Sequence, residues 1–303
     1  MTGLTDFITK AKWMDILTVW YVLVDDAYQA LQARFGPWRR RGPQPKFSDS
    51  EVITVSLLID TLFHGHEALG LAFVRQYQPD LFPALVPAGQ FNQRRRELGR
   101  IMEQVRQAVV QAWGLMDPDD PLRLIDSAPL PVCTYMRASR NATLAGPEYF
   151  SVMTTRKAKL FGLRLHLTVT PAQVVDQWLL APAAPSDGKV MAGFLEDAQD
   201  LIVFGDGAYH DPAVAQLLRD RHNIQVWATP RKDSTEPWPA AFRQWATRLR
   251  RRIETAISVL VTVFDVERLG SRSLSGLIAR VATRLLAYTL CFITGPILAH
   301  LGA

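Results

Sequence analysis

Three carboxylates in the second half of the chain have the residue types and settings of a metal-dependent phosphoryl-transfer site. Asp126 and Asp206 each follow an apolar segment that predicts a buried strand, and Glu254 lies in a long basic segment with helical spacing. Ligands of α/β sheets bind near the carboxyl ends of strands, so the two aspartates converge if their strands are neighbours. An oxygen-only ligand set without cysteine favours Mg²⁺, with Mn²⁺ as a substitute, over Zn²⁺.

Two such ions, about 3.5–4 Å apart, can activate a water or a 3′-hydroxyl and stabilise the leaving oxygen. Each carboxylate also has a plainer interpretation. Asp126 can be a turn residue after a strand, and Asp206 between two glycines can mark a tight turn. Glu254 can simply pair with Arg250, four residues earlier on a helix. The catalytic interpretation therefore requires Glu254 to face the two aspartates rather than Arg250 and solvent.

The elements that must position these residues divide near residue 120. Residues 1–116 predict an almost entirely helical region, in which Ser48 and Glu51 have capping-box spacing at the start of one helix. Residues 117–303 change to alternating strands and helices. The order of three strands, a helix, and then strand, helix, strand and helix predicts a mixed α/β sheet that begins as an antiparallel meander. The segments are strands at 122–126, 161–170, 174–181, 201–206 and 224–228, and helices at 189–198, 212–221 and 240–263.

Four ordered motifs connect the chain to a known family. They are Ile125-Asp126-Ser127-Ala128-Pro129-Leu130-Pro131-Val132-Cys133, Phe161-Gly162-Leu163-Arg164-Leu165-His166-Leu167, Gly205-Asp206-Gly207-Ala208-Tyr209 and Arg250-Arg251-Arg252-Ile253-Glu254-Thr255. With these motifs, roughly residues 45–290 resemble the DDE transposases of bacterial insertion sequences, and most of all the insertion sequence 982 family. Each motif alone is weak, whereas the ordered set is fairly specific.

The resemblance implies an RNase H-like catalytic fold, DNA as substrate and catalysis by two divalent metal ions. It assigns Asp126, Asp206 and Glu254 as the catalytic and metal-binding triad. Related transposases often carry a tyrosine three residues before the arginine and a lysine seven residues after the glutamate. This chain has Thr247 and Val261 at those positions.

Three further residues are candidates for supporting roles. His166 alternates with leucines on a predicted strand, so it either faces the site or is a hydrogen-bonded structural histidine. Asp187 is expected to be a helix cap near the site. Tyr209 completes the Asp-x-x-Tyr-like motif that Asp206 opens.

Clusters of arginine predict contacts with the DNA backbone, which would be sensitive to salt and nearly independent of sequence. A single cluster would be an ordinary solvated surface, but three in one chain beside such a triad favour DNA. The clusters are Arg39–Arg41, Arg94, Arg95 and Arg96, and Arg248 with Arg250, Arg251 and Arg252. The expected partners are the terminal inverted repeats and the target DNA, with the helical region recognising the ends and a homodimer pairing them.

Composition agrees with a globular DNA-binding protein. The chain has 303 residues, 48% of them hydrophobic, and a formal net charge of +5. Its two cysteines have no paired spacing, which fits a reducing compartment and a bacterial cytoplasmic location. The apolar segment 285–301 is short for a membrane span and is interrupted by Gly295-Pro296, so we expect a buried core helix and no membrane.

Two other functions fit the same residues. A host nuclease of this fold would cut DNA without joining it to a target. A DNA-binding regulator with an inactive catalytic domain would bind the repeats without metal-dependent chemistry, and the departures at Thr247 and Val261 are consistent with it.

Overall fold

The computed structural model describes residues 13–38, 42–141, 143–153, 158–230, 238–271 and 273–300. The chain forms two compact units. One unit consists of residues 116–261, and the other combines the two ends of the chain, residues 1–115 and 262–303. Each unit has its own core, and each is described by itself below.

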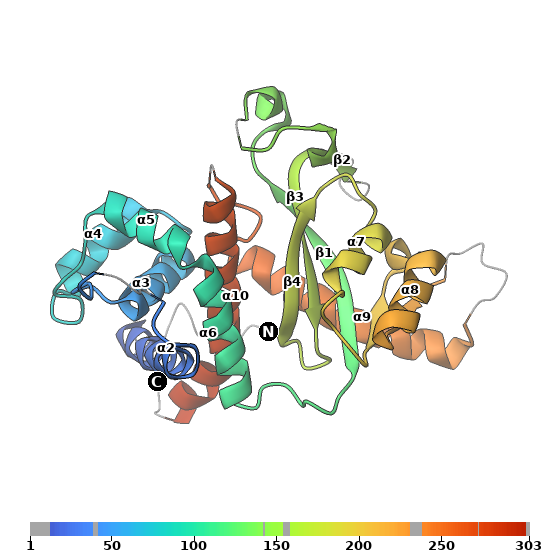
Figure 1. Ribbon diagram of the computed structural model, residues 1–303, viewed down its shortest axis with the longest axis horizontal. Coiled ribbons are helices and arrows are strands. Elements are labelled where there is room, and N and C mark those ends of the chain that lie inside the picture. The colour runs from blue at the N-terminus through green and yellow to red at the C-terminus, as the bar shows by residue number, and fades with distance from the viewer. Residues whose placement is uncertain are drawn as a thin grey trace. The chain divides into compact units, whose positions relative to one another are not determined.

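The unit of residues 116–261 is built on a six-stranded mixed sheet (Figure 1). Its strands are β1 (Leu122–Pro131), β2 (Phe150–Met153), β3 (Ala158–Val169), β4 (Val175–Pro182), β5 (Ile202–Gly205) and β6 (Gln225–Ala228). Along the sheet the order is β4-β3-β1-β5-β6, and β2 pairs with the first residues of β3. Strand β3 is antiparallel to β1 and β4, whereas β5 is parallel to β1 and β6. This is the RNase H-like sheet that the family resemblance implies, and its opening meander was predicted.

Helices cover both faces of this sheet (Figure 1). On one face, α7 (Asp187–Phe194) and α8 (Pro212–His222) bury Met191, Phe194 and Leu218 against Ile125 and Val203. The helix α9 (Ala240–Thr262) buries one stripe, formed by Ala246, Ile253, Ala256 and Leu260. Phe204 lies on the opposite face of β5 from Val203 and contacts the Trp245 ring of α9, at 6.1 Å between centroids. Hence α9, which carries Glu254, packs on the face away from α7.

The second unit consists of helices. They are α2 (Trp13–Phe35), α3 (Asp49–Leu62), α4 (Glu67–Tyr77), α5 (Ala88–Glu97), α6 (Gly99–Ala112) and α10 (Leu274–His300). The capping box predicted at Ser48 and Glu51 is present at the start of α3. The helix expected from Phe91 onward is two helices, α5 and α6, which meet at Leu98.

Helix α10 is the centre of the helical unit and packs against α6, α3, α5 and α2. Within the described residues, Leu274–Ile297 is the single helix that is long and apolar enough to cross a membrane. The pair Asp49–Leu62 and Glu67–Tyr77 passes the same test only together, with a bend of 114°. Of the apolar window in α10, 83% is buried inside the structure, as the core-helix interpretation expects.

The compact units differ from the division expected at residue 116. The N-terminal boundary agrees within a residue, but residues 262–303 pack with the helical region instead of with the sheet. The cause is burial. Every residue of α10 from Val281 to Cys291 is buried, so this helix needs other helices around its whole circumference.

Gly162 provides a test of the sheet's close packing. A Cβ built on this glycine would overlap the carbonyl oxygen of Leu130 on β1, a backbone atom that cannot move independently. We expect Gly162→Ala to lower the free energy of unfolding by about 2 kcal/mol, in the range of overpacked core substitutions. Urea denaturation followed by circular dichroism measures the change.

The matched control is Gly193→Ala in α7, where a Cβ meets nothing within 4 Å. Alanine favours a helix over glycine, so this variant should be as stable as the wild type or slightly more stable. Equal stability of the two variants would show that the contact between Gly162 and Leu130 does not constrain the sheet.

Candidate active site

Asp126 and Asp206 occupy matching positions on neighbouring parallel strands. The register pairs Leu122 with Ile202 and Leu124 with Phe204, and each aspartate follows two residues later. A Cβ at Gly205 would lie 2.8 Å from the Ile125 side chain, so glycine permits the close approach of the two strands. The sequence made convergence of the aspartates conditional on neighbouring strands, and this condition is met. The expected strand end at Asp126 is corrected, because β1 continues to Pro131 in its antiparallel pairing with β3.

The charges around Asp126 make its ionised form costly. The pKa of Asp126 is raised to about 7. Burial is the main cause, and the negative charges of Asp206 and Asp187 contribute to the same rise. The backbone N–H of Ser127, 2.7 Å from its carboxylate, and the positive charge of Arg250 act in the opposite direction. A carboxyl group with neighbours of this kind is a recognised mark of a functional site.

Glu254 does not face the aspartates in this structure. Its side chain is 49% exposed and accepts a hydrogen bond of 2.8 Å from Arg250. It is therefore Arg250 of α9 whose charge acts on Asp126. In the part of the chain that the structure describes, no three His, Cys, Asp or Glu side chains are grouped so as to hold a metal ion. The geometric requirement set for Glu254 is not met here, and its membership of the triad stays a prediction.

His166 and Tyr209 form a buried pair on the face of the sheet that α7 covers. The His166 Nδ1 lies 3.2 Å from the Tyr209 hydroxyl, and both residues are fully buried. Burial, and then the charge of Arg164, lowers the pKa of His166 to about 4, so the imidazole is neutral at physiological pH. The negative charges of Asp187, Asp126 and Asp206 all raise the Tyr209 pKa, after burial itself. His166 is thus hydrogen-bonded inside the core to Tyr209, whose pKa responds to the charges of the three aspartates.

Asp187 is the first residue of α7, and Ser186 holds the cap position that was expected of Asp187. The Asp187 carboxylate accepts hydrogen bonds from the Ser127 hydroxyl at 3.2 Å and from Arg164 at 3.2 Å. Neither Ser127 nor Arg164 was singled out from the sequence, although both lie in the quoted motifs. Their signal is cross-strand pairing, since Ser127 lies opposite His166, and Arg164 shares its face of β3.

The arginines predicted to contact DNA have unequal positions. Arg94 and Arg95 are buried in the helical unit, at 5% and 1% exposure, and pair with Asp49 and Asp60. For these two the expectation is corrected, because internal carboxylates occupy their guanidinium groups. Arg96 and Arg251 are exposed, and the Arg250 side chain is 37% exposed. The cluster Arg39–Arg41 lies outside the described residues.

The raised pKa of Asp126 predicts a dependence of stability on pH. The folded-state pKa of about 7 exceeds the unfolded value near 3.8, so the folded state loses stability as pH rises from about 4 to 7. We expect Asp126→Asn to remove this loss. The variant should match the wild type near pH 4 and exceed its free energy of unfolding by about 2 kcal/mol at pH 8, without metal, a value reduced for partial exposure.

Urea denaturation at pH 4, 6 and 8 in EDTA measures this difference. Asp220→Asn, on the exposed part of α8, controls for loss of a surface carboxylate. A difference between Asp126→Asn and wild type that stays constant with pH would contradict the electrostatic description of the site.

Comparisons with known proteins agree with these features. A family model described as "Transposase DDE domain" matches residues 117–290, more than half of the chain. No curated protein sequence matches the chain. Two solved structures have 13% identity to it: the Mos1 transposase paired-end complex with left transposon end, and the Mos1 mariner paired-end complex with Mn. The first covers 88% of this chain and 96% of its own at a TM-score of 0.22, and the second 85% and 98% at 0.19. TM-scores of 0.22 and 0.19 do not establish a shared fold. The family match, in contrast, spans both aspartates and Glu254. The chain belongs to the family of proteins with a transposase DDE domain.

Proposed function

We propose that this protein is an insertion-sequence transposase that cleaves DNA at the ends of its element and joins them to target DNA. The observation that carries the proposal is the placement of Asp126, within β1, beside Asp206, which directly follows the neighbouring parallel strand β5. Both lie within the segment matched by the transposase DDE family. The motif order resembles the insertion sequence 982 family most.

Asp126 and Asp206 fit a divalent metal ion. A buried carboxyl group whose neighbours include two further carboxylates gains from a cation that neutralises them, and hard oxygen ligands suit Mg²⁺ or Mn²⁺. Two ions are expected, and when bound they supply Lewis acidity that favours attack on a phosphate and stabilises the leaving oxygen. Glu254 is the proposed third ligand.

Arg250 competes with metal for Glu254. Their pair is exposed and joins residues four apart on one helix, an arrangement worth only about 0.3–0.5 kcal/mol. Releasing Glu254 from Arg250 is therefore inexpensive compared with the binding of a divalent ion. Freed from Glu254, Arg250 can join Arg251 and Arg96 as a contact to phosphates of duplex DNA.

The buried residues beneath the carboxylates orient the site. Asp187 holds Ser127 and Arg164, and the Ser127 backbone N–H in turn holds the Asp126 carboxylate. The neutral His166 fixes the Tyr209 side chain next to these groups. We assign His166, Asp187 and Tyr209 as positioning residues. Paired ends of the element fit a homodimer, the oligomer that we propose on DNA.

Substitution of the aspartates tests the activity. With Mg²⁺ and a DNA fragment bearing the element's end, Asp126→Asn and Asp206→Asn should each lower the cleavage rate at least about 1,000-fold, as expected when a site loses a group needed for transition-state stabilisation. Binding of the same fragment, measured by gel shift, should change little, because arginines and not carboxylates attract the phosphates of DNA.

Three outcomes would contradict the proposal. Cleavage by either variant at the wild-type rate would remove the aspartates from catalysis. Cleavage by the wild type with no joining of pre-cleaved ends would indicate a nuclease. End binding by the wild type without any cleavage in Mg²⁺ or Mn²⁺ would indicate a regulator.

A second prediction concerns the arginine that pairs with Glu254. Arg250→Gln removes a positive charge near Asp126 and a competitor for Glu254, so Mn²⁺ should bind about three- to ten-fold more tightly at pH 8, an effect of about 1 kcal/mol. Titration of Mn²⁺ by electron paramagnetic resonance measures the affinity directly. Arg252→Gln is the matched control, since Arg252 is exposed two residues further along α9. Equal Mn²⁺ affinity in the two variants would show that Arg250 does not compete with the metal.

A further inference from the structure

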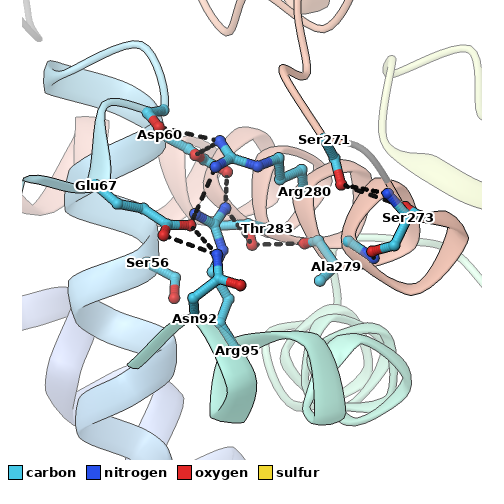
Figure 2. A network of polar contacts seen from close by, with 12 residues as sticks. Ser56, Asp60, Glu67, Asn92, Arg95, Ser271, Ser273, Ala279, Arg280 and Thr283 are labelled. Atoms are coloured by element: carbon cyan, nitrogen blue, oxygen red, sulfur yellow. Dashed lines mark hydrogen bonds and ion pairs between the residues drawn. The ribbon is translucent and has the colours of Figure 1, made fainter. Parts of the chain in front are cut away.

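A largely buried cluster in the helical unit is built from arginines and carboxylates. Three arginines, Arg95, Arg280 and Arg284, surround two carboxylates, Asp60 and Glu67. Figure 2 shows the Arg95 and Arg280 side chains meeting between these carboxylates. The negative charge of Asp265 also acts on Arg284, so the three arginines of the cluster are balanced by three carboxylates. Arg96, on the wall of the adjoining pocket, adds a positive charge beyond this balance.

Each carboxylate of this cluster has more than one arginine within ion-pair distance. Asp60 lies within ion-pair distance of all three arginines, at 3.6 Å from Arg280 and 4.0 Å from Arg284. Glu67 binds Arg95 at 3.3 Å and Arg280 at 3.0 Å, and Asn92 donates to both of its oxygens. Burial, and then the charge of Arg95, lowers the pKa of Arg280, whereas the charges of Asp60 and Glu67 act in the opposite direction.

The cluster adjoins a pocket of about 310 Å³, whose wall includes Arg95, Arg96 and Arg280. Arg95 is 1% exposed, and its Nε has no hydrogen-bond partner among the described residues. Arg96 is exposed, and in the described part of the chain it forms no ion pair. Arginine groups with unused donors around a polar pocket match the geometry of phosphate oxygens.

The opposite wall of the pocket is the start of α10. Ser271 and Ser273 line it, and the Gly276 backbone N–H donates to the Ser273 hydroxyl. A Cβ on Gly276 would overlap the Ser271 hydroxyl oxygen, so glycine lets these serines fold over the first turn of the helix. The N-terminal end of a 27-residue helix adds a partial positive charge on this side.

We propose that this pocket binds a phosphate group, and that in the working protein the group is a backbone phosphate of duplex DNA. The DNA source rests on the proposed function, whereas the phosphate chemistry rests on the pocket alone. The pocket would give the helical unit an anchor for DNA separate from the carboxylates of the sheet unit.

Binding measurements on the full chain in EDTA test the proposal without metal-dependent chemistry. The probes are inorganic phosphate, followed by calorimetry, and a short DNA duplex, followed by fluorescence anisotropy across a salt series. The test variant is Arg96→Gln, at an exposed position of the pocket wall. The matched control is Arg100→Gln, also exposed but not part of the wall.

Arg96→Gln should lower the affinity for both probes about three- to ten-fold. It should also lower the slope of log affinity against log salt concentration for the duplex by about 1, as expected for the loss of one phosphate contact. Arg100→Gln should leave phosphate binding unchanged. A second variant, Ser273→Asp, keeps a side chain able to cap α10 and places a carboxylate at the pocket. We expect it to abolish phosphate binding while the protein stays as stable to heat as the wild type or becomes more stable.

The outcomes separate the sources of the phosphate. Weaker binding of both inorganic phosphate and duplex by Arg96→Gln supports the DNA anchor. Loss of inorganic phosphate binding with unchanged duplex binding overturns the DNA source and leaves a site for a free phosphate compound. If the wild type binds phosphate through Arg96 but binds no duplex, the phosphate pocket is supported and the proposed function is contradicted. Wild-type binding of both probes by Arg96→Gln and Ser273→Asp overturns the pocket altogether.

Discussion

The repulsion between the carboxylates of Asp126 and Asp206, which lie on neighbouring interior strands of the sheet, is the constraint on which the site depends. The pairing of β1 with β5 places Asp126 and Asp206 at the same level, where burial and like charge both oppose ionisation. The fold tolerates this arrangement because other contacts hold it: the Ser127 backbone N–H, the Arg250 charge, and the packing of α7 and α9 on the two faces. Proteins accept such local cost mainly where a function needs it.

The parts of this site that were predictable from the sequence are those set by local pattern. An apolar segment followed directly by an aspartate marked both Asp126 and Asp206. Outside the site, in the helical unit, the capping box at Ser48 is likewise a four-residue signal. The order of strands and helices was enough for the antiparallel meander and the mixed sheet. These features depend on neighbours in the chain, which the sequence displays directly.

The parts that were not predictable depend on partners far away in the sequence. Three consecutive arginines on a helix point in different directions, and only the positions of Asp49 and Asp60, 45 and 35 residues earlier, show that Arg94 and Arg95 turn inward. For Glu254, in contrast, the partner found in the structure is close in the sequence. Its partner Arg250 lies four residues away on the same helix and hydrogen-bonds to it, whereas the proposed role beside the aspartates would depend on bound metal ions.

The helical unit is made from both ends of the chain, with the sheet unit inserted between them. During synthesis, residues 116–261 leave the ribosome as one continuous segment and can fold as they emerge. Helices α2 to α6 are made earlier but must wait, with apolar faces uncovered, until the central helix α10 has followed the sheet unit. A chain that stopped before α10 would therefore consist of a folded sheet attached to helices without a core. Such a product would expose apolar surface and become a target for proteolysis.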